Sequence, residues 1–329
     1  MGSARIRNSF LSLALLLPFL SCGRVSLAAS ECDYQKGGNC QLPVNGVTRT
    51  YVLHVPPSFH PGSSGLVIAF HGSRSRGSEF AAFTDLNAGA DKMGYAVAYP
   101  DGLPSARGVV SWNAYFGFIN ASNPPDDSAF AREMILSLQA NLRPDPKRIY
   151  VTGFSAGAFM AHRVAIDHSD LVAAAAIVEG SLWDRPADRD LRPPQPKAPV
   201  SILILHTDTD QVVHYCGVDN GHVVDASQDD TFNYWSQANS CKSVKPNSNL
   251  CSKFLGHPTS VMAKTATNCS AETEVQFYRL AGGLHWWYGG QLNIPPGNSN
   301  RPYNSILDSS TGTTTNDIIW KFFAAHAKR

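Results

Sequence analysis

Stretches of consecutive apolar or β-branched residues recur along this chain and alternate with segments of helical pattern. Five such stretches, at 66–70, 95–99, 149–152, 172–178 and 200–206, have the continuous hydrophobicity of strands that are buried on both faces of a sheet. Between them, the spacing of apolar residues predicts helices at 80–92, after Asp126, at 156–166 and at 232–238. This alternation predicts an α/β fold with a mostly parallel central sheet and helices on both faces.

The two ends of this pattern differ from its middle. Residues 50–55 alternate between apolar and polar positions and stop at two prolines, which predicts an early antiparallel strand. The last strand is expected at 274–280, and a closing helix at 317–327. We interpret Asp126 and Asp127 as N-terminal caps of the helix that follows them, rather than as catalytic acids. In such a sheet, ligand chemistry is expected at the carboxyl ends of the strands.

A G-x-S-x-G motif joins the stretch 149–152 to the helix that follows it. Gly153 and Gly157 lie two residues before and after Ser155, which lets strand and helix approach closely and leaves the serine at the apex of a tight turn. In this arrangement, the nucleophile elbow, the amide of Ala156 points at the same spot as the serine hydroxyl. The alternative is a glycine-rich structural turn, but the strand before and the helix after favour a nucleophile.

A serine nucleophile needs a histidine to take its proton and a carboxylate to orient that histidine. In this architecture the acid follows a later strand, and the histidine lies in the loop before the final helix. His285 meets the second condition, whereas packing or surface roles are expected for His214, His222, His257 and His326. The sequence pattern leaves two acids open, Asp208 and Asp210, which follow the stretch 200–206.

The stretch 66–70 ends at His71, Gly72 and Ser73. A backbone amide at this position, expected to be that of Ser73, would join the amide of Ala156 in an oxyanion hole. The alternative is that His71 and Gly72 only terminate the strand. Beside the elbow, the oxyanion interpretation is favoured.

Aromatic residues gather in two places near the expected catalytic set. Two tryptophans follow His285 directly, and the long irregular stretch 103–125 adds further rings, among them Tyr115 and Phe116. Flat aromatic faces can stack on a phenolic acyl group or a sugar ring, although rings in loops also serve as local packing. The residues expected to contact substrate are His71, Trp112, Trp286 and Trp287.

The first thirty residues have the layout of a secretory signal peptide. Basic residues occur at 5 and 7, an apolar run at 11–20 and small residues at 26, 28 and 30. The apolar run is too short to span a bilayer. We therefore expect a signal peptide at 1–30, a single catalytic domain at 31–329, and secretion to the extracellular space or a periplasm. A lipid-modified Cys22 is the alternative, but the residues before it fit that pattern poorly.

Six cysteines remain after residue 30, an even number that predicts disulfides in an oxidising compartment. Cys32 and Cys40 enclose a short loop and are expected to pair with each other. The other four allow three pairings and suggest a disulfide-pinned insertion near 240–270; they are Cys216, Cys241, Cys251 and Cys269. Their spacing does not match a zinc site, so no metal is expected.

Several motifs together resemble the secreted feruloyl esterase and polyhydroxybutyrate depolymerase family of α/β-hydrolases, a group like carbohydrate esterase family one. The resemblance covers nearly all of the chain after residue 30. Its motifs are His71-Gly72, the Pro-Asp-Gly turn at 100–102, Trp112-Asn113, the aspartates at 126–127, the elbow, the segment 206–215, Gly283 to His285 and the region of Trp287. It implies the α/β-hydrolase fold and a serine esterase that needs no cofactor.

The same resemblance selects one of the two acids. In that family the acid segment runs His-Gly-Thr-x-Asp and then x-Val-Val-x-Tyr, and the residues after Asp210 match the second half. The resemblance therefore implies the triad Ser155, Asp210 and His285. Two positions depart from the family pattern: Thr207-Asp208 replaces Gly-Thr, and Ala158 stands where a second glycine is frequent.

Taken together, these features predict a secreted serine esterase that hydrolyses carboxylic esters through an acyl-enzyme. Feruloyl-type esters of plant cell-wall polysaccharide are the expected substrates, with polyhydroxybutyrate depolymerase or hydroxyalkanoate oligomer hydrolase activity as the runner-up. A non-catalytic, carbohydrate-binding member of the fold is the alternative from another class. The net charge of +1 gives no electrostatic footprint for nucleic acid or an anionic membrane, and no membrane span is expected.

Overall fold

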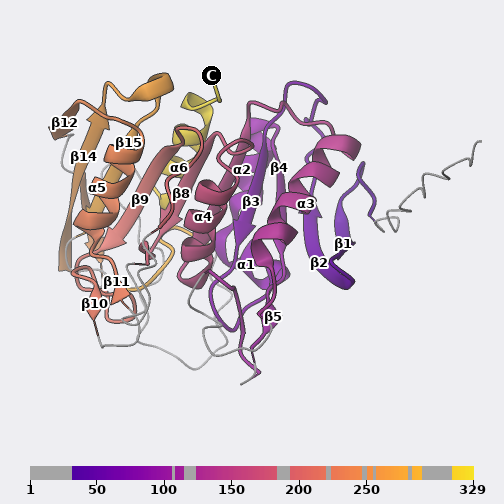
Figure 1. Cartoon of the computed structure of the whole chain (residues 1–329), viewed down its shortest axis with the longest axis horizontal. Helices are drawn as coiled ribbons and strands as arrows, with labels where there is room; N and C mark the ends of the chain where they lie inside the picture. Colours follow the sequence, from indigo (N-terminus) through magenta and orange to yellow (C-terminus); the bar gives the residue numbers. More distant parts are fainter. Residues whose placement is uncertain are drawn as a thin grey trace, which may run out of the picture.

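The computed structural model describes residues 32–105, 108–114, 124–183, 193–219, 224–246, 250–254, 257–280, 284–290 and 313–329. The described residues form a sheet of eleven strands in the order β1-β2-β4-β3-β7-β8-β9-β15-β14-β12, with β13 paired to β14 (Figure 1). The pairs from β4 through β3, β7, β8 and β9 to β15 are parallel, and the pairs at both edges are antiparallel. The predicted α/β fold is thereby confirmed.

The elements have the following bounds. The strands of the main sheet are β1 (Gly38–Val44), β2 (Val47–His54), β3 (Leu66–Phe70), β4 (Ala96–Pro100), β7 (Ile149–Phe154), β8 (Ala174–Val178), β9 (Ser201–Thr207), β12 (Ser243–Pro246), β13 (Leu250–Phe254), β14 (His257–Thr267) and β15 (Val275–Leu280). The helices are α1 (Gly77–Thr84), α2 (Leu86–Met93), α3 (Asp127–Asn141), α4 (Ala156–Asp167), α5 (Gln228–Ala238) and α6 (Thr315–Ala325). Two short ribbons, β5 (Leu103–Pro104) with β6 (Val110–Ser111) and β10 (Val218–Asp219) with β11 (Val224–Asp225), lie outside the sheet.

Helices cover both faces of the sheet, which explains why the central strands are hydrophobic throughout. Buried side chains of α3, α4 and α5 pack with one face in a first core, and those of α1, α2 and α6 pack with the other face in a second. Every residue of β3, β4, β8 and β9 is buried. Such strands cannot show the alternating pattern of a sheet with one wet face.

The register brings the carboxyl ends of the parallel strands to one edge of the sheet. The paired residues near this edge are Phe70 with Gly153, Phe154 with Val178, Val178 with Leu205, and Thr207 with Leu280. The residues that follow these strands are therefore neighbours in space, although more than 200 positions separate the first from the last. This edge is where the catalytic set was predicted.

The helix predicted at 80–92 is two helices. Asp85 adopts a left-handed backbone conformation, with φ of 54° and ψ of 30°, and it ends α1 and begins α2. A single residue in this region turns the chain and breaks the helical hydrogen-bond series. The apolar spacing of the two helices is nearly continuous, so the pattern alone did not reveal the break.

Only one of the two aspartates at the start of α3 is a helix cap. Asp126 accepts a hydrogen bond from the amide of Ala129 at 2.9 Å, as predicted. The cap prediction for Asp127 is wrong, because its side chain is buried and pairs with Arg49 at 2.6 Å while accepting from the amide of Asn113 at 2.7 Å. Asp127 therefore ties α3 to β2 and to the loop before α3.

The insertion predicted near 240–270 extends the sheet by antiparallel strands. Disulfides join Cys32 to Cys40, as predicted, and Cys241 to Cys269, which closes the base of this extension. Cys216 is exposed and forms no disulfide with a described residue, and the side chain of Cys251 lies outside the described part. The predicted signal peptide, residues 1–30, lies outside the described residues. Among the described helices, none combines the length and the hydropathy needed to cross a bilayer.

Candidate active site

Ser155 occupies a strained turn between β7 and α4. Its φ of 55° and ψ of −123° are rare for a residue with a side chain, and such strain persists where surrounding structure enforces it. A Cβ atom on Gly153 would lie 2.1 Å from the carbonyl oxygen of Gly157, and one on Gly157 would lie 2.0 Å from that of Phe70. Both glycines are needed because α4 crosses β3 and β7 at backbone contact.

The loop after β3 lies against the elbow. A Cβ atom on Gly72 would be 3.4 Å from the Cβ of Ser155, so the chain at 71–73 passes directly beside the predicted nucleophile. Ser73 is exposed, and neither its amide nor that of Ala156 donates a hydrogen bond to a described residue. The first amides of a helix have no partner within the helix, which leaves Ala156 available to an oxyanion.

His71 and Trp112 support this loop from behind rather than facing a substrate. His71 is fully buried; the amide of Gly102 donates to its Nε2 at 3.0 Å, so Nδ1 carries the proton and donates to the carbonyl of Gly72 at 2.7 Å. Burial lowers the pKa of His71 and thus favours this neutral form. Trp112 is buried as well and donates to the carbonyl of His71 at 2.8 Å. In this conformation neither side chain offers a substrate-contacting surface.

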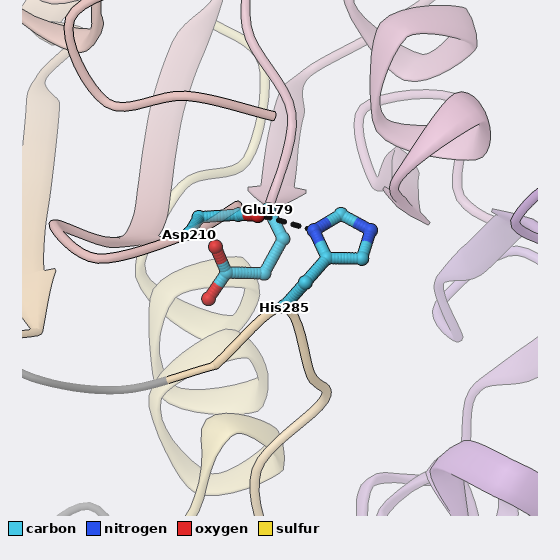
Figure 2. A group of neighbouring side chains, drawn as sticks. All are labelled: Glu179, Asp210 and His285. Carbon is cyan, nitrogen blue, oxygen red and sulfur yellow. Dashed lines mark hydrogen bonds and ion pairs between the residues drawn. The ribbon is translucent and has the colours of Figure 1, made fainter. Parts of the chain in front are cut away.

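Asp210 and His285 are joined by a short hydrogen bond (Figure 2). Oδ2 of Asp210 lies 2.6 Å from Nδ1 of His285, and Oδ1 accepts from the amides of Val212 and Val213 at 2.7 and 3.0 Å. Burial pushes the pKa of Asp210 up, but the hydrogen bond and charge of His285 and the two amides outweigh it, so the net pKa is lowered. Asp210 is therefore ionised at neutral pH and fixes the orientation of the imidazole.

Asp208, the other acid left open by the pattern, points elsewhere. Its Oδ2 lies 2.9 Å from Nη2 of Arg279 on β15, and that ion pair is partly exposed. The two acids are two residues apart in a tight turn after β9, so their side chains diverge. The geometry favours Asp210 as the partner of the histidine.

His285 lies beside the elbow but does not hydrogen-bond to the serine in this structure. Its ring packs on Phe154, the residue before Ser155, with ring centroids 4.8 Å apart. The side-chain hydroxyl of Ser155 forms no hydrogen bond with a described residue, although its backbone amide donates to the carbonyl of Val178 at 3.1 Å. Nucleophile–base contacts are often looser without substrate, and they tighten when the reacting complex forms.

Glu179 is a site residue that was not predicted. It follows β8 directly, its side chain is buried, and one of its carboxyl oxygens lies within 4.8 Å of the facing atoms of Asp210 and His285. Figure 2 shows the three side chains converging from different loops. The sequence feature that could have identified Glu179 is its position, because an acidic residue there follows a buried strand that neighbours the elbow strand.

This group of three does not have the character of a metal centre. The 2.6 Å separation of Asp210 Oδ2 and His285 Nδ1 is that of a hydrogen bond, and two atoms that share one ion lie farther apart. Both oxygens of Glu179 already form hydrogen bonds with Thr207. The donor atoms are thus used by one another and by Thr207.

A half-buried aromatic surface leads away from His285. Phe83 packs edge-on against Trp286 at 5.0 Å and lies 5.9 Å from Phe154, which in turn packs on His285. We call Phe83, Phe154 and Trp286 the aromatic wall. Trp287, in contrast, is fully buried in the second core and donates to Asn316, so it offers no surface to a substrate. Tyr115 and Phe116 lie outside the described residues.

Residues 49–187 match the family model described as Esterase PHB depolymerase. An esterase-named relative, NocK of Nocardia uniformis subsp. tsuyamanensis, is 34% identical over 181 residues, which are 54% of this chain and 50% of the relative. Poly(3-hydroxyalkanoate) depolymerase C of Paucimonas lemoignei is 30% identical over 179 residues, 54% of this chain and 40% of the relative. Feruloyl esterase B of Piromyces equi is 26% identical over 265 residues, 75% of this chain and 46% of the relative.

The chain thus spans half or less of the length of these relatives. Among solved structures, acetyl xylan esterase from Aspergillus awamori superposes with a TM-score of 0.55 at 14% identity, over 88% of this chain and 99% of that one. At this identity the likeness concerns the fold alone, which is that of the α/β-hydrolases. The family match therefore covers the segment that holds Ser155, and the fold is that of the α/β-hydrolases.

Proposed function

We propose that this protein is a serine ester hydrolase with the triad Ser155, His285 and Asp210. The observation that carries the proposal is the hydrogen bond from His285 Nδ1 to the buried, ionised Asp210, on the sheet edge that also holds the strained elbow. That bond leaves Nε2 of His285 as the atom that can take a proton. The names of the relatives support ester hydrolysis as the reaction class.

In the proposed reaction, Ser155 Oγ attacks the ester carbonyl carbon while its proton passes to Nε2 of His285. The amides of Ser73 and Ala156 hydrogen-bond to the oxyanion, and Asp210 stabilises the imidazolium. His285 then returns the proton to the alcohol oxygen as the carbon–oxygen bond breaks, which leaves an acyl-enzyme. Water attacks the acyl group with the help of His285, and the acid is released as Ser155 regains its proton.

The aromatic wall supports an ester with an aromatic acyl group. Phe83, Phe154 and Trp286 are only half buried and run outward from His285, where an acyl group bound to Ser155 would lie. A feruloyl ring could pack against this surface, whereas a hydroxybutyrate chain offers no ring to stack. We therefore propose feruloyl-type esters as substrates, in line with the name of the Piromyces equi relative.

The runner-up is hydrolysis of hydroxyalkanoate esters. The family description and the name of the Paucimonas lemoignei relative both favour it. An apolar polyester chain would also find contact area on the aromatic wall, because burial of apolar surface needs no ring. The two substrates share the triad and differ in what the wall recognises.

The deciding experiment is the ratio of kcat/KM for methyl ferulate to that for the methyl ester of a hydroxybutyrate dimer. Aromatic packing of about 1 kcal/mol should favour ferulate about five-fold or more. Trp286→Ala should lower this ratio, and Trp286→Phe, which keeps a ring, should largely preserve it. A wild-type ratio below one would select the hydroxyalkanoate ester.

We also propose that the protein is secreted after removal of residues 1–30. The two disulfides support passage through an oxidising compartment, where such bonds persist. N-terminal sequencing of protein collected outside the producing cells would test this. A chain that begins at Met1 in that material would contradict cleavage.

A further inference from the structure

Glu179 stands between the nucleophile and its partners on the carboxyl edge of the sheet. It follows β8, which is flanked by the elbow strand β7 and the acid strand β9. Its backbone has a φ of 49°, a conformation that costs energy for a residue with a side chain, and the residue is only 1% exposed. Backbone strain and the burial of an acid are both unfavourable, so this placement calls for a compensating interaction.

Thr207 supplies that interaction. Its amide donates to Oε2 of Glu179 at 3.1 Å, and its hydroxyl lies 2.6 Å from Oε1. The side chain of Thr207 replaces the glycine of the acid segment in the family pattern, so the hydroxyl is a feature of this chain's own sequence. Glu179 is thereby fixed to the start of the turn that presents Asp210.

The same hydroxyl continues to the loop that carries the base. Thr207 Oγ1 lies 3.2 Å from the carbonyl oxygen of Leu284 and 3.2 Å from the hydroxyl of Tyr288. Tyr288 in turn accepts from the amide of Leu284 at 2.7 Å and donates to its carbonyl at 2.8 Å. Leu284 immediately precedes His285, so one buried series of hydrogen bonds joins Glu179 to the backbone of the base.

The groups that face Glu179 favour a neutral carboxyl. From the acid turn, Asp210 presents a negative charge, and its cationic partner during the reaction is His285 from the base loop. His206 on β9 lies 3.6 Å from Glu179, but burial lowers the pKa of His206 to about 4, so it is uncharged at neutral pH. Tyr288 is neutral as well, and no lysine or arginine among the described residues pairs with Glu179. An ionised Glu179 would be a buried anion beside another anion.

We propose that Glu179 is a positioning residue that works as a neutral, protonated carboxylic acid and joins the acid turn and the base loop into one unit through Thr207 and Tyr288. A protonated carboxyl can donate to the Thr207 hydroxyl while still accepting from the Thr207 amide, and the hydroxyl then donates to Leu284. Every group in the series is satisfied in this state. The proposal rests on the proposed serine hydrolase function for its catalytic consequence, but the protonation state can be tested without turnover.

Electrostatics agree with this geometry. Burial raises the pKa of Glu179 well above its usual value of 4.5, and the negative charge of Asp210 raises it further. The hydrogen bonds that the Thr207 amide and hydroxyl can donate to an ionised Glu179 lower its pKa, but they are outweighed. A glutamine at position 179 would keep the same shape, accept from the Thr207 amide and donate to its hydroxyl, so it mimics the neutral acid.

The catalytic test compares Glu179→Gln with Glu179→Ala in steady-state kinetics. Glu179→Gln should keep kcat within about two-fold, whereas Glu179→Ala should lose roughly 10- to 100-fold in kcat with KM little changed, because the acid and base lose their common support. An equal loss in both variants would overturn the proposal, since it would show that a charged carboxylate is required.

The second test measures protonation directly from the pH dependence of unfolding. A folded-state pKa above 4.5 means that the stability contributed by Glu179 is complete below about pH 4.5 and is lost as pH rises through the folded-state pKa. Because glutamine does not titrate, the free energy of unfolding of Glu179→Gln relative to wild type should increase as pH rises above about 4.5. Glu133→Gln, at an exposed position on α3, is the matched control and should show no such trend.

A stability difference between Glu179→Gln and wild type that stays constant from about pH 4.5 to 8 would overturn the proposal, because it would mean that Glu179 ionises in the folded protein as it does in the unfolded chain. This readout does not depend on activity. If Ser155→Ala left hydrolysis unchanged, the proposed function would fail while the protonation of Glu179 could still be measured.

Discussion

The two halves of the candidate site are built in different ways. On the nucleophile side, Ser155 is held by backbone contacts so close that Gly153 and Gly157 admit no side chain. On the acid–base side, Asp210 and His285 are held by buried polar side chains, chiefly Glu179, Thr207 and Tyr288. The nucleophile side depends on two residues that have no side chain, and the acid–base side depends on a series of specific hydrogen bonds.

This difference explains why the halves should respond differently to substitution. Backbone contact leaves no room for adjustment, so an added methyl group must move a strand or a helix. A hydrogen-bonded series can lose a member and still keep its fold, although the groups left unpaired lose their orientation. Substitution of the glycines that support the nucleophile should therefore appear first in stability, and substitution of the polar residues that support the acid and base should appear first in turnover.

The largest effect is expected for the reacting groups themselves, one from each side. Ser155→Ala and His285→Ala should each lower kcat by about 10⁴-fold or more, and the double variant should be little worse than either, because the groups act as one unit. Steady-state kinetics on a soluble ester would measure this. Additive losses in the double variant would separate the two halves and contradict a shared mechanism.

A smaller effect is expected from the acid, and it has a matched control in the same turn. Asp210→Asn should lower kcat by on the order of 10³- to 10⁴-fold, since the amide cannot stabilise the imidazolium of His285. Asp208→Asn weakens a partly exposed pair with Arg279 and should change kcat little. A reversed result would assign the acid to Asp208.

The smallest effects are expected for two supporting residues, Gly157 on the nucleophile side and Thr207 on the acid–base side. Gly157→Ala should destabilise the fold by about 1–3 kcal/mol, because its Cβ would lie 2.0 Å from the carbonyl oxygen of Phe70. Thr207→Ala should cost about 1–3 kcal/mol from unpaired groups around Glu179 and should also reduce kcat. Thermal unfolding and kinetics would be measured on both. If Thr207→Ala lowered stability but left kcat intact, the acid–base side would not depend on side-chain support.

The nucleophile side could be predicted from the sequence more fully than the acid–base side, because close backbone contact restricts which residues can occur. Backbone contact demands glycine at fixed spacing, so Gly153, Ser155 and Gly157 are visible as a motif, and the continuous apolar strands around them predict the parallel sheet. His285 could be named from its place before α6. The choice between Asp208 and Asp210, however, needed a family resemblance, because two acids in one turn have the same pattern.

The remaining features depend on tertiary contacts that no local pattern records. Glu179 follows an ordinary buried strand, and only the register of β7, β8 and β9 brings it to Asp210. Asp127 has the sequence context of a cap but pairs with Arg49, which lies far back in the chain. Aromatic residues beside the site were equally ambiguous: Trp286 keeps an exposed surface, whereas Trp287 and Trp112 are buried.

The central claim is that Ser155 is a nucleophile activated by His285, and covalent labelling tests it most directly. Folded protein would be treated with a fluorophosphonate, and the modified residue would be identified by mass spectrometry of its peptides. The account predicts one adduct, on Ser155, that is absent in Ser155→Ala and forms far more slowly in His285→Ala. The absence of an adduct on Ser155 in the folded wild-type protein would contradict it.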